Sequence, residues 1–304
     1  MSWRDPSEKT LALLLLAPAF CLIAMVVIYP VGKLLHDSFF ELQLSGGARA
    51  VEFVGFRNFA DALDDKEFWN AARNTFVITA VTVPGALLVG LGLALLANLP
   101  FRFKWVVRLS LLLPWALPLS FCGLIFAWFF HTDYGVVNDV LRLLGAREPA
   151  MWLLNPQWAM AAICLTIIWK TSSFVALILL AGLQMIPHSL YEAAQVDGAT
   201  RWQQFCQITL PLLVPSIIVA MIFRTLTALQ TFDIPYTMTK GGPGSSTETL
   251  AMLIHKTTID YLDLGYGSAL AVMLFLISMA VTGLYLRQIG KQSLSLIHIS
   301  EPTR

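Results

Sequence analysis

Six of the polar side chains inside stretches that are otherwise apolar enough to be buried in lipid are candidates for contact with a substrate. Two of them, Lys170 and Ser173, stand within the apolar run of residues 159–183. The other four belong to the run of residues 210–232 and are Arg224, Thr227, Gln230 and Thr231. Hydroxyl, amide and cationic groups supply the hydrogen-bond donors and acceptors that a sugar needs and that lipid lacks. These six residues are therefore predicted to line a substrate pathway.

Each part of this polar group has a structural alternative. Arg224, Thr227 and Thr231 follow the spacing i, i+3 and i+7, so they share one stripe of a helix, and such a stripe also holds helices together in lipid. Lys170 either forms a wall of the cavity or pairs with a carbonyl or carboxylate group of the bundle. Arg224 favours an anionic substrate unless it pairs with Asp233 or another carboxylate.

The sequence contains no pattern typical of catalysis. The glycine-rich loop 239–244 lacks the GK[ST] ending of a phosphate-binding loop, and no strand pattern precedes it. The four cysteines stand singly without CxxC spacing, and the histidines are scattered. The chain is therefore predicted not to be an enzyme and to have no catalytic residue, metal site or cofactor of its own.

Composition indicates how these residues are positioned. Of 304 residues, 57% are hydrophobic and 13% are charged, which is typical of an integral membrane protein. The net charge of +1 argues against a nucleic-acid partner. Runs long enough to span a bilayer number six, at approximately 11–35, 74–97, 105–130, 159–183, 210–232 and 265–286. An all-α protein with six transmembrane helices is expected.

Two of these runs carry features that indicate their packing. The second contains Gly85, Gly90 and Gly92, small residues that favour close helix contacts in lipid. The third contains Pro114 and Pro118, so its helix is expected to be broken or bent midway. Broken helices in transporters often line the substrate path.

A polar insert, residues 190–211, separates the fourth and fifth apolar runs. Its residues Leu190, Ala193, Ala194 and Asp197 fall on one face of a helix, and the small side chains allow close approach of another backbone. Gly198 permits a sharp turn before a second helix begins. The insert is predicted to be a helix-turn-helix outside the hydrocarbon, with a shape suited to docking.

The spacing in this insert resembles a known signature. Glu192-Ala193-Ala194, three residues, Gly198, nine residues, and then Ile208 with Leu210-Pro211 is similar to the EAA motif of membrane subunits of bacterial ABC importers. The chain up to Lys291 resembles the carbohydrate-uptake branch, with the maltose and glycerol-phosphate permeases. This resemblance implies the type I importer permease fold and a cytoplasmic coupling loop, residues 185–211. It implies ATPase-coupling roles for Tyr191, Glu192, Ala193, Ala194, Asp197, Gly198 and Ala199.

The resemblance also implies the partners and the energy source. It predicts a second, homologous permease in a heterodimer, a cytoplasmic ABC ATPase dimer that holds ATP and Mg²⁺, an extracytoplasmic solute-binding protein and a carbohydrate substrate in a lipid bilayer. The asparagines of the maltose permease correspond to about Ala228 and Thr231 here, so a different ligand is expected. A secondary active solute transporter is the alternative, but Asp233 is its only candidate ion-coupling carboxylate.

Charges flanking the apolar runs predict the topology. Arg4 and Lys9, the cluster 102–108, and Arg287 with Lys291 all mark one side as cytoplasmic, while the acidic segment 61–67 lies outside. A multi-pass protein of the bacterial cytoplasmic (inner) membrane with both termini in the cytoplasm is expected. The predicted divisions are a tail and first span (1–36), an extracytoplasmic cap (37–71), a five-helix permease core (72–291) and a non-native or disordered tail (292–304).

Overall fold

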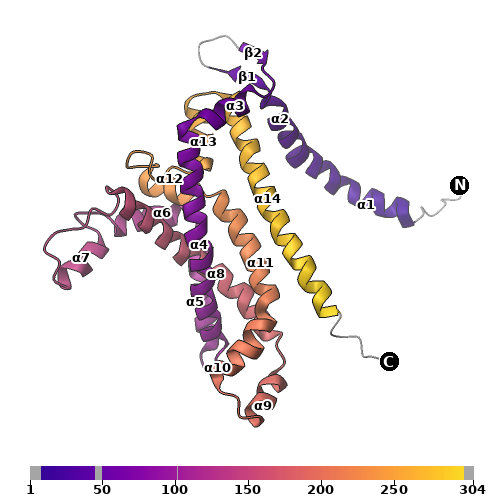
Figure 1. Ribbon diagram of the computed structural model, residues 1–304, viewed down its shortest axis with the longest axis vertical. Helices are drawn as coiled ribbons and strands as arrows, with labels where there is room; N and C mark the ends of the chain where they lie inside the picture. Colours follow the sequence, from indigo (N-terminus) through magenta and orange to yellow (C-terminus); the bar gives the residue numbers. More distant parts are fainter. Residues whose placement is uncertain (1–7, 45–49, 101, 298–304) are drawn as a thin grey trace. The chain divides into compact units, whose positions relative to one another are not determined.

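The computed structural model describes residues 8–44, 50–100 and 102–297, and Figure 1 shows its ribbon. The chain divides into two compact units. Unit 1 combines the chain up to Asp65 with Ile254–Phe275, and unit 2 combines Lys66–Leu253 with the chain from Leu276 onward. Each unit is thus assembled from two segments that are distant in the sequence.

Unit 1 begins with a long apolar helix. It consists of α1 (Glu8–Ile23), the π-helical turn η1 (Ala24–Ile28) and α2 (Tyr29–Asp37). The stretch Leu11–Asp37 is long and apolar enough to cross a membrane, and none of its most apolar part is buried within the described chain. Its leucine, isoleucine and valine side chains therefore require lipid or another subunit to cover them.

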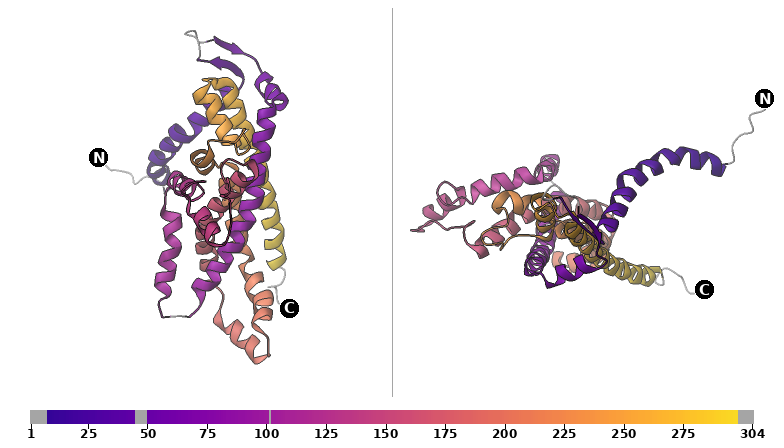
Figure 2. Two further views of the ribbon diagram at one scale, coloured as in Figure 1. Left: turned by 90° about the vertical axis from the view of Figure 1, so that its left-hand side faces the viewer. Right: turned by 90° about the horizontal axis from the view of Figure 1, so that it is seen from above.

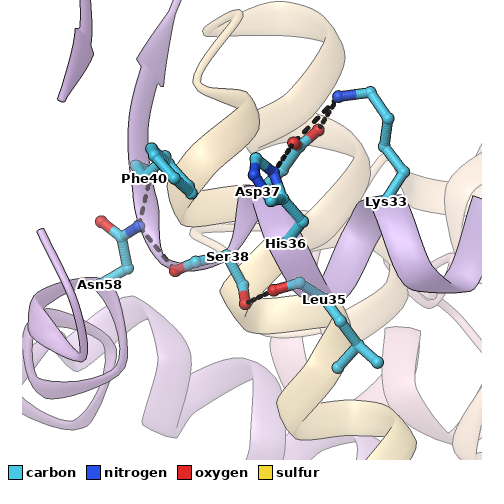
Figure 3. Close-up of polar contacts among 7 residues, drawn as sticks. All are labelled: Lys33, Leu35, His36, Asp37, Ser38, Phe40 and Asn58. Atoms are coloured by element: carbon cyan, nitrogen blue, oxygen red, sulfur yellow. Dashed lines mark hydrogen bonds and ion pairs between the residues drawn. The ribbon is translucent and has the colours of Figure 1, made fainter. Parts of the chain in front are cut away.

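A short hairpin and a helix follow this first span. The strands β1 (Phe40–Gln43) and β2 (Ala50–Phe53) pair antiparallel, and α3 (Arg57–Asp64) comes next. Figure 3 shows that Asn58 Nδ2 donates to the carbonyl oxygens of Ser38 and Phe40, both at 3.0 Å. In the same view, Lys33 Nζ lies 2.8 Å from Asp37 Oδ2. These contacts fix the end of α2 and the first strand against α3.

The second segment of unit 1 returns to this hairpin. It contains η3 (Lys256–Asp260) and the first turns of α14 (Leu264–Ile297). The Leu44 amide donates to the Leu262 carbonyl at 3.0 Å, and the Tyr266 hydroxyl donates to Asp65 Oδ2 at 2.9 Å. The predicted tail 292–304 falls partly on α14, and residues 298–304 lie outside the described residues.

Unit 2 is built around two long helices, α4 (Lys66–Asn98) and α8 (Pro156–Gln184), with α11 (Leu210–Leu229) packed against both. Figure 2 gives two further views of them. A Cβ added at Gly90 would lie 2.6 Å from Val175 Cγ1, and one at Gly85 would lie 2.6 Å from Ile168 Cδ1. The predicted close helix contacts are confirmed at these two glycines, whereas a Cβ at Gly92 would meet nothing within 4 Å.

The third apolar run forms two helices, α5 (Lys104–Ala116) and α6 (Leu119–Phe129), which are bent by 93°. Leu117 and Pro118 between them have extended backbones, with ψ of 138° and 142°. The predicted break is confirmed, and it falls at the second of the two prolines. The described chain thus holds five helices able to cross a membrane, or six if this pair counts as one span.

A polar excursion joins α6 to α8 and contains α7 (Val136–Leu143). Its centre is Asn138, which is 1% exposed. Its Nδ2 donates to the carbonyls of Thr132 and Ala150 at 2.9 and 3.0 Å, and its Oδ1 accepts from the Ala150 amide and Trp152 Nε1 at 3.1 and 3.0 Å. The Asn138 side chain therefore links the two ends of this loop.

The remaining helices are α9 (His188–Val196), α10 (Arg201–Gln204), the π-helical turn η2 (Phe205–Thr209), α12 (Asp233–Thr239) and α13 (Leu250–His255).

Candidate functional site

A cavity of about 470 Å³ lies beside the break between α5 and α6, entirely within unit 2. Four elements line it: the break itself, α8, the last turns of α11, and the start of α12. Its lining residues are Trp115, Leu117, Leu119, Ile167, Lys170, Thr171, Phe174, Phe223, Arg224, Thr227, Ala228, Gln230, Thr231, Phe232, Asp233 and Ile234. Its size is within the range of about 300–1,000 Å³ that is usual for ligand pockets.

Five of the six residues predicted for the substrate pathway line this cavity, namely Lys170, Arg224, Thr227, Gln230 and Thr231. The sixth, Ser173, is only 2% exposed and does not line it. Each residue of a helix turns by about 100°, so positions 167, 170, 171 and 174 of α8 share one arc of about 100°. Ser173 lies about 60° beyond the edge of this arc, which places it in the helix packing instead.

Lys170 combines the two roles that the sequence left open. Its side chain lines the cavity although the residue is only 6% exposed. Its Nζ donates to the carbonyl oxygen of Trp115, in the last turn of α5. The carbonyls of a last helical turn have no intrahelical partner, so the break frees an acceptor for the buried ammonium group. The partner is thus a neutral carbonyl, and the charge of Lys170 is not cancelled by it.

Arg224 is held by hydroxyl groups. The residue is 4% exposed. Its Nη1 donates to Thr227 Oγ1 at 2.8 Å and its Nη2 donates to Thr82 Oγ1 at 3.3 Å. The predicted alternative, pairing with Asp233, is not present: the Asp233 carboxylate accepts from the Ser120 hydroxyl at 2.8 Å. Within the part of the chain that the structure describes, Arg224 forms no ion pair.

Aromatic residues complete the cavity, and their positions in the sequence did not predict this role. Trp115 precedes the break, while Phe174 of α8 and Phe223 of α11 face each other edge to face with ring centroids 6.2 Å apart. Apolar and aromatic walls with a few polar groups are typical of small-molecule sites. The only available sequence signal was the position of Trp115 next to the two prolines of the predicted break.

The predicted docking insert has the expected helix-turn-helix form. α9 has no buried residue, and α10 begins with a capping box between Thr200 and Gln203. Between the helices, Gly198 has a φ of +78°, in the left-handed region that side chains other than glycine rarely adopt. A Cβ at Gly198 would meet nothing within 4 Å, so the backbone conformation alone requires glycine here. The Ala199 amide then donates to the Ala194 carbonyl at 2.9 Å and closes the turn.

Of the other residues predicted for coupling, some are exposed on the surface, and one, Tyr191, forms a hydrogen bond within the protein. Ala193, Asp197 and Glu192 are exposed, and Glu192 lies 3.3 Å from Nδ1 of His188 on the same helix. Tyr191 turns inward, and its hydroxyl lies 2.9 Å from Thr209 Oγ1 in η2. This contact connects α9 to the base of α11.

The docking insert and the predicted basic loop lie at the same end of unit 2. Figures 1 and 2 place α9 and α10 at the end where α4 finishes and α5 begins. The turn between α4 and α5 carries Arg102. The cluster that the charge rule assigned to the cytoplasm thus shares one end with the insert that the motif assigned there.

Comparison with known proteins decides the family. Residues 86–289 match the family model described as "Binding-protein-dependent transport system inner membrane component". The chain belongs to this family. It is an ABC transporter permease, and the alternative of a secondary active transporter receives no support.

Two relatives of this permease carry the names of carbohydrate transport systems. The sulfoquinovosyl glycerol transport system permease protein SmoG of Agrobacterium fabrum is 65% identical over 94% of this chain and 92% of its own length. The trehalose/maltose transport system permease protein MalF of Thermococcus litoralis is 36% identical, over 92% of this chain and 94% of its own.

Solved structures confirm the fold. A bacterial ABC transporter that imports the acidic polysaccharide alginate matches the permease with a TM-score of 0.81 at 23% identity, over 94% of this chain and 97% of that one. A bacterial alginate ABC transporter in complex with an alginate pentasaccharide-bound periplasmic protein matches with a TM-score of 0.81 at 22% identity, over 93% and 95% of the two chains. The predicted type I importer permease fold is confirmed.

Proposed function

We propose that this permease forms half of the translocation pathway of an ATP-driven importer for a sugar conjugate. The observation that carries the proposal is the convergence of Lys170, Arg224, Thr227, Gln230 and Thr231 on one cavity. The cavity adjoins a broken helix, the kind of element that forms midplane substrate sites in transporters. Its hydroxyl and amide groups match sugar hydroxyls, and its aromatic walls match the apolar faces of a sugar ring.

The substrate that we propose is sulfoquinovosyl glycerol. Its support is the identity of 65% with SmoG over nearly the full length of both chains. At 36% identity, the trehalose/maltose permease indicates the broader class of carbohydrates.

The energy is proposed to come from a cytoplasmic ATPase dimer that holds ATP and Mg²⁺, since the chain has no phosphate-binding motif of its own. α9 is the element that would enter a groove of this ATPase, because it exposes Glu192 and Ala193, and the exposed Asp197 directly follows it. A second permease subunit and a solute-binding protein complete the assembly. The proposed orientation places both termini and the α9–α10 turn in the cytoplasm, in agreement with the basic residues beside α5.

Reconstituted transport tests this function. The permease, its second permease, the ATPase and the binding protein would be placed in proteoliposomes with labelled sulfoquinovosyl glycerol. We expect uptake that requires ATP and the binding protein and that persists when ion gradients are collapsed. Uptake that needs no ATP, or ATP-driven uptake of trehalose or maltose only, would contradict the proposal.

A further inference from the structure

The guanidinium of Arg224 is a buried cation in an apolar helix, and no described carboxylate neutralises it. Two of its hydrogen bonds go to threonine hydroxyls, Thr227 on its own helix and Thr82 on α4. Its Nε is also buried and has no hydrogen-bond partner. A charge inside a membrane span is costly unless it pairs with another group or faces a functional cavity. Since Arg224 lines the cavity, we expect the group that pairs with its charge to belong to a ligand bound in the cavity.

The hydrogen-bond geometry leaves donors for such a partner. The two terminal nitrogens of a guanidinium carry four hydrogens, and the contacts of Arg224 with threonine use two of them. Thr227 Oγ1 in turn lies 2.9 Å from the carbonyl of Phe223, so its hydroxyl donates to the backbone and accepts from the arginine. The threonines therefore orient the guanidinium fork and leave part of it available.

The other charged groups of the cavity do not cancel this cation. Lys170 is bound to a neutral carbonyl, and Asp233 accepts from Ser120. Two cations and one carboxylate line the cavity, which leaves a formal surplus of one positive charge. A ligand with one negative group would balance this surplus, and a neutral ligand would leave it uncompensated in a low-dielectric site.

We propose that Arg224 is the anion-recognising residue of this cavity, and that the permease favours sugars carrying one singly charged oxyanion group over their neutral counterparts. The inference rests on the proposed function, since it assigns a role to the same cavity. Arginine suits this role because its planar fork binds the oxygens of carboxylates and related oxyanions at two points. Thr82 and Thr227 act as positioning residues that hold the fork.

A binding experiment on the assembled transporter in nanodiscs, without the binding protein, tests the role of Arg224. The probes are sulfoquinovosyl glycerol and glucosyl glycerol, which has a hydroxyl group in place of the sulfonate. We expect the wild type to prefer the sulfonated probe. Arg224→Gln should weaken binding of this probe by about ten- to a hundredfold, the effect of losing one hydrogen bond to a charged group, and should change binding of the neutral probe little.

Three further variants keep the test independent of folding. Arg142→Gln is the matched control, because Arg142 is exposed on α7, where its Nη1 lies 3.2 Å from Asp139 Oδ1. It should behave as the wild type. Arg224→Lys keeps the charge without the fork, so it should retain part of the preference. Thr82→Val removes one positioning hydroxyl, and it should reduce the preference without reversing it. If Arg224→Gln does not assemble with its partners, Arg224→Lys and Thr82→Val still measure how much the guanidinium group contributes to the preference.

The outcomes separate the two proposals. Equal binding of both probes by the wild type, or an unchanged preference in Arg224→Gln, overturns the anion role while leaving ATP-driven uptake intact. A wild-type transporter that takes up no sulfonated sugar with ATP overturns the proposed substrate itself. Loss of the preference in Arg224→Gln, with partial retention in Arg224→Lys, supports the inference.

Discussion

Replacing Gly198 by alanine isolates the part that backbone conformation plays in the proposed coupling to an ATPase. The φ of +78° at Gly198 lies in the left-handed region, which costs a residue with a Cβ about 1–2 kcal/mol. A Cβ there would meet nothing within 4 Å, so no steric clash adds to this cost. A free-energy change of this size lowers the population of the native turn about 5- to 30-fold relative to its alternatives. The α9–α10 turn should therefore present α9 to the proposed ATPase partner in its native orientation less often.

The assay is the ratio of sugar uptake to ATP hydrolysis in proteoliposomes. Gly92→Ala is the matched control, because a Cβ at Gly92 also meets nothing within 4 Å, but Gly92 lies within the helix α4. Alanine in a helix is more favourable than glycine by about 0.5–1 kcal/mol, so this control should keep its coupling. We expect the ratio for Gly198→Ala to fall about fivefold or more, with ATP hydrolysis retained. Equal ratios in the two variants would refute the reasoning.

Three further substitutions test other contacts. Gly90→Leu inserts a side chain where even a Cβ would lie 2.6 Å from Val175, so the thermal unfolding of the purified permease should show a loss of about 1–3 kcal/mol. Tyr191→Phe removes the contact of 2.9 Å with Thr209 and should cost about 1 kcal/mol at the base of α11, which reduced uptake with normal assembly would reveal. Asn138→Ala leaves several buried polar partners unsatisfied, so the loop between α6 and α8 should become sensitive to limited proteolysis, and unchanged cleavage would contradict this expectation.

The sequence predicted local breaks and turns well, because single residue types determine them. Proline at 118 cannot continue the hydrogen bonds of a helix and disfavours helical geometry at Leu117, which favours a break at this pair. Pro84 and Pro114 lie inside α4 and α5 without ending them, so proline indicated only candidate positions for the break. Glycine at 198 marked a turn for the same kind of reason. The angle of 93° was not predictable, because it depends on how α6 packs against α12, which lies more than a hundred residues further along the chain.

The cavity was predicted only in part, since helical spacing shows which residues share a stripe but not which stripe faces the cavity. Ser173 was assigned to the pathway because it is polar and close to Lys170, yet the helix turns it into the protein core. The contact of Arg224 with Thr82 was missed for a related reason: the two residues lie 142 positions apart in the sequence. The hairpin of unit 1 was not predicted either, because its four-residue strands are too short to give a clear alternating pattern.

The helical run from Arg201 to Leu229, made of α10, η2 and α11, leads from the docking turn to the cavity. At about 1.5 Å per residue, its axis separates Arg201 from Arg224 by roughly 35 Å. The π-helical turn η2 lies within this run, and such turns are points at which a helix bends, so η2 is the place where the run can flex between the two sites. If the proposed ATPase tilts the α10 end, the part of this motion that passes η2 would displace the guanidinium of Arg224, and the affinity of the cavity for its proposed ligand would change with it.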